Sequence, residues 1–325
     1  MQKFLLRHRF WTTSVAAFAM VFGLGMSADG QVVTDIINDS FVDGDPVDNG
    51  LPLESRWFYT SSGSALDDGP QTPGVLDFAS GTSGRAIHSI FAAQSLALVG
   101  DKLTGSIDYV TPATVGTGED IRFGFFDTST SPGFSATGNN PNGFADNITA
   151  SSNSAEPGLN IAGFSGGADI NDAGTGDLEY RFSDTANGTG RLLTTTGGFS
   201  NIGFGTDDGT DMGATAVAPN TAGNIMFMIE NIGGGQVELT QTLFGETFTR
   251  TANAADTGTT FDFIGLSVTS GAFGSVNSVG EPDNGLDITN VTVQFTTTAS
   301  AIPEPSSVAL LGLGCVGLFG RRRRR

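Results

Sequence analysis

Carboxylates are the residues of this sequence whose types and spacing point most directly to chemistry. Residues 43–50 hold three of them, and residues 281–287 hold three more. Calcium takes six to eight oxygen ligands, and a loop of this composition can supply about half of them. The spacing differs from an EF-hand, where ligands fill the first, third and fifth positions and glycine the sixth. The candidate calcium ligands are Asp43, Asp45, Asp48, Asp283 and Asp287.

The two acidic segments lie at opposite ends of the central part of the chain. In jelly-roll modules the first and last strands often lie side by side, so both segments could contribute to one calcium site. The alternative is two solvated acidic turns without a metal. A rise in melting temperature on adding calcium separates the two interpretations.

A second possible chemistry is acid and base catalysis by paired carboxylates. Glycosidases of the concanavalin-like fold place carboxylates at alternating positions of one strand, where they share a face. The comparable pair here is Asp177 and Glu179, followed by Arg181. Apolar residues alternate with these three, which favours a solvent-facing strand surface with an ion pair. We therefore predict no catalytic residue in this chain.

The small number of histidines limits the chemistry that they can perform. Outside the first thirty residues His88 is the only histidine, so a zinc site built on several histidines is excluded. A Ser-His-Asp triad would depend entirely on His88, and no nucleophile elbow lies near it in the sequence. We expect a histidine on a strand surface.

Aromatic residues offer the last candidate site. Trp57 and Tyr59 alternate on a short strand-like segment, so one face could present a platform for a sugar ring. Core packing is the alternative for Trp57. Phenylalanine dominates the aromatic residues, with 25 Phe against 3 Tyr and 2 Trp, which fits a core better than a sugar platform.

Charge and cysteine content exclude several classes of function. Eight of the fifteen Lys and Arg residues and two of the 34 acidic residues lie outside residues 31–302, so this central part carries seven basic and 32 acidic residues, a net charge of -25. Such a surface repels nucleic acid. The single cysteine, Cys315, lies near the C-terminus, so no intramolecular disulfide can form.

The N-terminal thirty residues have the pattern of a secretion signal. A basic start with Lys3, Arg7 and Arg9 leads into an apolar stretch over residues 10–25 and then into small residues. The apolar stretch is short for a membrane span of about 20 residues, which favours cleavage near Ala28 or Gly30 by signal peptidase. An uncleaved membrane anchor is the alternative.

The C-terminal end combines three parts in a fixed order. Pro303, Glu304 and Pro305 precede an apolar run over residues 308–319. Five arginines follow, namely Arg321, Arg322, Arg323, Arg324 and Arg325. The prolines keep the tripeptide extended, and the arginines hold the end of a short transmembrane helix in the cytoplasm, so the central part faces the periplasm.

This tail resembles the PEP-CTERM sorting domain of Gram-negative bacteria, also catalogued as the ice-binding protein C-terminal domain. The resemblance covers about the last 24 residues. It implies recognition and cleavage by an exosortase near the tripeptide, followed by transfer to the cell surface or to an exopolysaccharide matrix. An ordinary C-terminal anchor is the alternative. Ice binding would need a flat, regular threonine array, which we do not expect from the strands.

Residues 31–300 are predicted to form one all-β domain, between the signal peptide (1–30) and the sorting tail (301–325). Apolar and polar residues alternate over short runs that Gly, Asn and Asp separate, and no amphipathic helix is expected. The predicted strands are 56–60, 75–78, 86–91, 103–110, 121–126, 160–164, 178–182, 225–231, 237–243, 247–250, 261–269 and 286–296. Residues 127–156 and 194–224 are predicted long loops.

Two segments, residues 120–127 and 261–268, resemble paired strands of concanavalin-like or laminin-G-like jelly rolls. The resemblance implies a two-sheet jelly-roll sandwich. The sequence thus predicts an exported surface or matrix protein with a non-catalytic structural or carbohydrate-binding domain, helped by calcium. Its expected partners are signal peptidase, exosortase, the membrane and polysaccharide. A secreted glycan hydrolase is the alternative.

Overall fold

The computed structural model describes residues 31–42, 53–59, 66–67, 74–78, 85–113, 115, 120–129, 162–169, 176–181, 199–202, 217–268, 272–273 and 285–298. The chain divides into two compact units, one of residues 33–297 and one of residues 1–32 with 298–325. The predicted signal peptide and C-terminal span lie outside the described residues. In the described ranges, no helix has the length and apolar character needed to cross a membrane.

Fifteen strands and one short 3-10 helix, η4 (Ala254–Asp256), form the regular structure of the described ranges. The strands are β1 (Gln31–Asp39), β2 (Trp57–Tyr59), β3 (Leu66–Asp67), β4 (Leu76–Phe78), β5 (Arg85–Ser95), β6 (Lys102–Val110), β7 (Asp120–Asp127), β8 (Ala162–Asp169), β9 (Gly176–Arg181), β10 (Phe199–Asn201), β11 (Ala222–Gly233), β12 (Gln236–Leu243), β13 (Glu246–Asn253), β14 (Thr260–Val268) and β15 (Leu286–Thr298).

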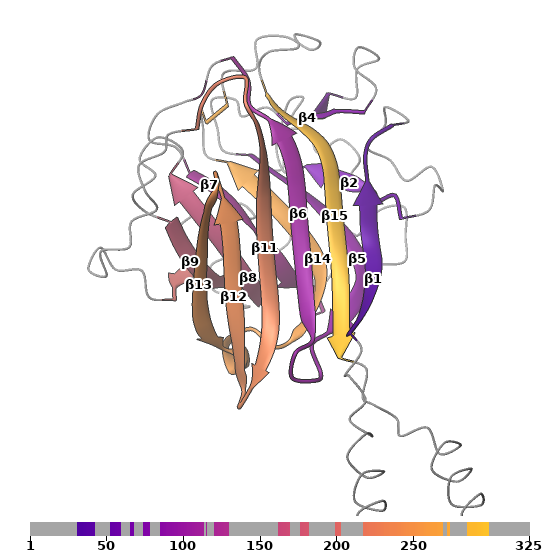
Figure 1. Cartoon of the computed structure of the whole chain (residues 1–325), viewed down its shortest axis with the longest axis vertical. Coiled ribbons are helices and arrows are strands. Elements are labelled where there is room, and N and C mark those ends of the chain that lie inside the picture. The colour runs from indigo at the N-terminus through magenta and orange to yellow at the C-terminus, as the bar shows by residue number, and fades with distance from the viewer. Residues whose placement is uncertain are drawn as a thin grey trace, which may run out of the picture. The chain divides into compact units, whose positions relative to one another are not determined.

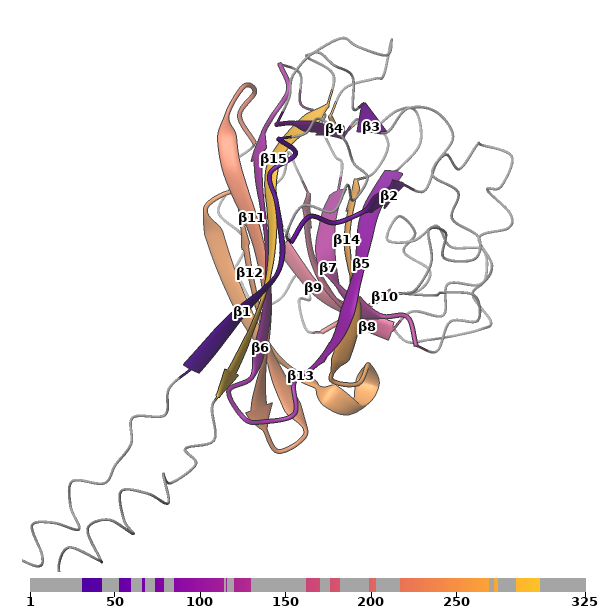
Figure 2. The same cartoon turned by 90° about the vertical axis from the view of Figure 1, so that its right-hand side faces the viewer.

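The strands form two sheets that lie face to face (Figures 1 and 2). Sheet A has the order β13-β12-β11-β6-β15-β4-β3, with β1 also beside β15, and sheet B has the order β10-β9-β8-β7-β14-β5-β2. Between β4 and β7, and again between β13 and β15, successive strands alternate between the sheets. Strands far apart in the sequence thereby become neighbours, such as β14 between β5 and β7.

The core lies between the sheets, and both contribute to it. β6 alternates strictly between half-buried and buried positions, which is the pattern of a strand with one face on the core. Phe125 of β7 and Phe227 of β11 meet across the interface with ring centroids 6.3 Å apart. Gly105 makes room for these rings, because a Cβ at that position would lie 2.7 Å from Cζ of Phe125.

The prediction of an all-β two-sheet jelly-roll sandwich is confirmed. Each of the twelve predicted strands overlaps an observed strand, and the prediction missed β1, β3 and β10. The predicted loop over residues 194–224 is wrong at both β10 and the start of β11. β3 and β10 have two and three residues, too few for a period of two to be recognised.

Candidate functional site

Trp57, one of the two predicted sugar-platform residues, lies in the core with 5% of its surface exposed. Its indole Nε1 donates a hydrogen bond of 2.8 Å to Oδ2 of Asp39, and its ring packs at 6.1 Å from that of Phe41. Core packing is therefore the role that the structure gives Trp57. Tyr59 closes β2, and its side chain lies outside the described set.

Asp39 connects the two sheets at this point. It ends β1 of sheet A and is itself buried, while Trp57 begins β2 of sheet B. Besides the indole, the Asp39 carboxylate accepts hydrogen bonds from the backbone N–H groups of Phe41 (3.1 Å) and Ser55 (3.3 Å). These bonds supply the partners that a buried carboxylate requires. This arrangement is not visible in the sequence, because its partners come from separate segments.

Aspartate residues of three strands share one register position near the edge of sheet A. Asp287 of β15 pairs with Asp77 of β4, and Asp77 pairs in turn with Asp67 of β3. Like charges directly opposite each other destabilise a sheet unless a cation or another partner compensates them. Asp77 and Asp67 were not among the predicted ligands. Their relation to Asp287 depends on strand pairing, which the sequence does not reveal.

Of the predicted calcium ligands, Asp287 alone lies within the described ranges. The others lie outside them, namely Asp43, Asp45, Asp48 and Asp283. Among the side chains that the structure describes, no group of three or more His, Cys, Asp or Glu is arranged to hold a metal ion. Oδ1 of Asp77 lies where a Cβ on Gly285 would be, so this carboxylate packs over the residue that precedes β15.

His88 is buried, and the expectation of a histidine on a strand surface is wrong. Its imidazole stacks on Phe263 with a centroid distance of 4.8 Å and an interplanar angle of 16°. Desolvation by burial lowers the pKa of His88 to about 3, so the ring is neutral at physiological pH. The physical reason is that sheet B is buried on both faces here, as the run of buried residues over 86–89 indicates.

The pair Asp177 and Glu179 lies on β9 of sheet B. Glu179 pairs with Ser165 of β8, and Asp177 pairs with Gly167. Continuing across the sheet, the register runs from Ser165 through Gly124 to Gly265 and His88. Glu179 and His88 therefore occupy one register row of the sheet. The side chains of β9 lie outside the described set.

A polar cluster occupies the outer face of sheet A, where β11, β6 and β15 run side by side. Nδ2 of Asn224 lies 2.7 Å from both Oδ1 of Asp108 and Oγ of Ser106, and Nδ2 of Asn290 lies 3.5 Å from Oδ2 of Asp108. Asn224 is exposed and Asp108 is half-buried. This amide cluster, Ser106, Asp108, Asn224 and Asn290, offers hydrogen-bonding groups suited to the hydroxyl groups of a sugar.

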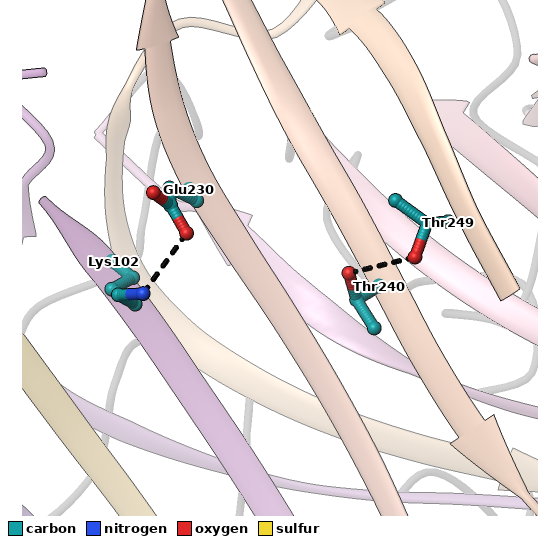
Figure 3. Close-up of polar contacts among 4 residues, drawn as sticks. All are labelled: Lys102, Glu230, Thr240 and Thr249. Atoms are coloured by element: carbon teal, nitrogen blue, oxygen red, sulfur yellow. Dashed lines mark hydrogen bonds and ion pairs between the residues drawn. The ribbon is translucent and has the colours of Figure 1, made fainter. Parts of the chain in front are cut away.

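Hydroxyl pairs continue the same outer face across β12 and β13. Oγ1 of Thr240 lies 3.2 Å from that of Thr249 (Figure 3). The Oγ1 atoms of Thr242 and Thr247 lie 2.9 Å apart. On β6 and β11 the ion pair of Lys102 and Glu230, at 3.0 Å, completes this polar surface (Figure 3). Threonines alternate along β12 and β13, and this spacing is visible in the sequence, although no regular threonine array was expected from the strands.

Burial shifts the pKa values of two further groups, Asp262 and Tyr109. Oδ1 and Oδ2 of Asp262 accept hydrogen bonds from N and Oγ1 of Thr128 at 2.8 and 2.7 Å. Burial raises the pKa of Asp262, with a smaller contribution from the nearby Asp127, and the bonds from Thr128 oppose the rise. Burial also raises the pKa of Tyr109 to about 12.

The fold and its surfaces define a class: a two-sheet jelly-roll sandwich with a buried interior and a polar outer face on sheet A. The chain continues beyond β15 into a PEP-CTERM protein-sorting motif, which the family model matches over residues 301–325. This motif implies export, anchoring in the membrane before cleavage, and processing by an exosortase. None of the curated proteins compared with the chain matches it.

Several solved structures resemble the whole domain at low identity. The carbohydrate recognition domain of Emp47p is 13% identical, with 82% of this chain and 95% of that chain covered and a TM-score of 0.40. The endo-1,3-beta-glucanase from Streptomyces sioyaensis is 12% identical (83% and 99% covered, TM-score 0.41). The VIP36 exoplasmic/lumenal domain, in a Ca2+/Man2-bound form, is 11% identical (84% and 90% covered, TM-score 0.36).

Proposed function

We propose that this chain is an exported cell-surface or exopolysaccharide-matrix protein whose sandwich is a non-catalytic structural or carbohydrate-binding module. The sorting motif over residues 301–325 carries the proposal, because it joins the sandwich directly after its last strand. In this proposal signal peptidase removes residues 1–30, and the arginine cluster keeps the tail in the membrane until exosortase cleaves near Pro303, Glu304 and Pro305. The domain then reaches the surface or the matrix.

The sorting step can be tested with the tripeptide. Replacing Glu304 by Ala, in cells that contain an exosortase, is expected to leave the full-length protein in the membrane fraction. Wild-type protein would instead lose its tail and appear at the surface or in the medium. Glu281→Ala serves as the matched control, because Glu281 is also a glutamate that precedes a proline. Equal processing of all three proteins would contradict the sorting role of the tripeptide.

The amide cluster supports carbohydrate binding by the sandwich. Its carboxylate and amide groups lie together on an open sheet face, and hydrogen bonds hold them in fixed positions. A glycan array separates binding from no binding, and a screen for release of reducing sugars tests the hydrolase alternative. We expect binding without release. Release of reducing sugar by the wild-type protein would overturn the non-catalytic assignment.

Calcium forms the last part of the proposal. The proposed ligands are Asp43, Asp45, Asp48, Asp283 and Asp287, and the facing position of Asp77 on β4 supports the last of them. Calcium at about 100 times its dissociation constant is expected to raise the melting temperature by roughly 5–10 °C over a chelator. Asp287→Asn should reduce this rise, whereas Glu238→Gln, on β12 of the same sheet, should not. An unchanged melting temperature would remove calcium from the proposal.

A further inference from the structure

Exposed apolar residues gather at one end of the sandwich. Leu98 is 44% exposed and Val99 is 64% exposed in the β5–β6 turn, and Ile232 is 38% exposed near the end of β11. The two segments contact each other, since a Cβ on Gly233 would lie 3.0 Å from Cγ2 of Val99. We call this surface, formed by residues 96–101 and 231–235, the tip.

Backbone and side-chain hydrogen bonds hold the tip in a fixed shape. N of Gly100 donates to the carbonyl of Asn231 at 2.7 Å, and N of Asn231 donates to the carbonyl of Asp101 at 2.9 Å. Nδ2 of Asn231 donates to the carbonyl of Leu96 at 2.8 Å. The apolar side chains are therefore presented outward by an ordered surface.

The tip is neutral at its surface, although the central part of the chain is strongly acidic. Residues 96–100 and 231–237 contain no charged side chain. The one carboxylate of the tip, Asp101, is 2% exposed and accepts hydrogen bonds from N of Leu98 (2.7 Å) and Oγ1 of Thr297 (2.8 Å). An apolar, uncharged surface of this kind can approach a lipid bilayer without desolvating a charge.

The tip also lies at the end of the sandwich from which the sorting tail departs. Thr297, which bonds to Asp101, is the second-last residue of β15. Figures 1 and 2 show the end of β15 beside the β5–β6 turn, with the β11–β12 hairpin at the same end of the sandwich. From Thr298 to Val308, where the apolar run of the tail begins, the chain spans ten steps, which is at most about 35 Å. β15 itself is about 40 Å long, so the tether is shorter than the sandwich.

We propose that the tip rests on the outer surface of the membrane that the sorting tail spans, so that the sandwich stands on this end while it is anchored. The inference rests on the proposed anchoring and adds an orientation to it. A short tether makes the contact intramolecular, so a small apolar patch is sufficient to hold it. The contact would keep Pro303, Glu304 and Pro305 at the membrane surface, within reach of a membrane protease.

The test uses the full chain in phosphatidylcholine vesicles, with Cys315→Ser removing the native thiol. A fluorescent NBD group on Val99→Cys reports on the tip, and the same group on Val42→Cys is the matched control. Val42 is 67% exposed, close to the value for Val99, and it follows the C-terminal end of β1. Spin-labelled lipids are expected to quench the probe at position 99 at least about twofold more than the probe at position 42.

The results of quenching and flotation support or overturn the orientation as follows. Leu98→Ser with Ile232→Ser should lower the quenching at position 99 and leave position 42 unchanged, which supports the proposal. Vesicle flotation without quenching at position 99, or with equal quenching at both positions, overturns the orientation while anchoring stands. Quenching that rises with the protein-to-lipid ratio indicates a second copy on the tip and also overturns it. A chain that does not float with the vesicles refutes the anchoring, and the orientation with it.

Discussion

The two sheets of the sandwich differ in how far their outer faces are buried. Along β6 of sheet A, every second residue is half-buried and meets the surface. Along β14 of sheet B, all residues from Phe263 to Val268 are buried, so both faces are covered. Sheet A therefore combines a core face with an outer face that carries threonine, asparagine and aspartate together with two half-buried methionines of β11. Where β5 and β14 pair, both faces of sheet B are interior, and burial there keeps His88 neutral.

The two sheets are expected to differ in how much an added methyl group destabilises them, and this is the largest effect we expect. Gly124→Ala in sheet B would place a Cβ against the backbone of Phe164 and Ser165, which cannot move without breaking the β7–β8 pairing. We expect a loss of at least about 3 kcal/mol in unfolding free energy, or no folding. Gly223→Ala in sheet A meets the ring and hydroxyl of Tyr109, a side chain that can shift, and should cost less.

Urea denaturation of both glycine variants measures this contrast. Equal losses of unfolding free energy in the two sheets would contradict the view that sheet B is the more tightly constrained layer. Circular dichroism at low urea distinguishes a variant that folds weakly from one that does not fold.

The next largest effect concerns the bond that joins the sheets. Asp39→Ala removes the acceptor of Trp57 Nε1 and of two backbone N–H groups. Buried donors left without acceptors should cost about 2–3 kcal/mol in unfolding free energy. Asp39→Asn, which retains one carbonyl oxygen, should cost less. A fluorescence-monitored unfolding curve, with Trp57 as a probe, tests the order of the two variants, and the reverse order would refute the proposed link.

His88 of sheet B should make the stability of the domain depend on pH in the acidic range. Its folded-state pKa of about 3 lies below its ordinary value of 6.5, so the unfolded chain binds the extra proton between these values. The stability from this group is complete above pH 6.5 and falls as the pH drops, by about 1.4 kcal/mol per pH unit. His88→Leu should remove this component, which the difference between the two curves of unfolding free energy against pH reveals. Parallel curves would exclude it.

The smallest effect on stability is expected in the amide cluster. Asn224→Ala breaks exposed hydrogen bonds of sheet A and should change the unfolding free energy by less than about 1 kcal/mol. Its effect on glycan binding should be larger, because it removes a side chain that the proposal places against sugar. Thr249→Ala, two strands away on the same face, is the control. Loss of stability without loss of binding would assign the cluster to the fold alone.

Local patterns explain how far the sequence could predict the fold. Strands such as β6 and β11 were predicted because alternation is visible where one face meets water. The prediction placed His88 on the surface because apolar and polar residues do not alternate where both faces of a strand are buried. Small neighbouring residues such as Ala86 and Ser89 then do not indicate which face is the core. In the candidate site, the position of Trp57 stayed open between core and surface, since its partner Asp39 comes from another strand.

The sequence by itself determined the sorting tail, the acidity of the central part and its β character, because each is a property of composition or of neighbouring residues. Tertiary structure alone decided the facing of Asp77 and Asp287, the amide cluster and the neutral tip beside the end of β15. The physical reason is that these groups come from strands paired across long separations in the chain. Their register depends on the packing of both sheets together.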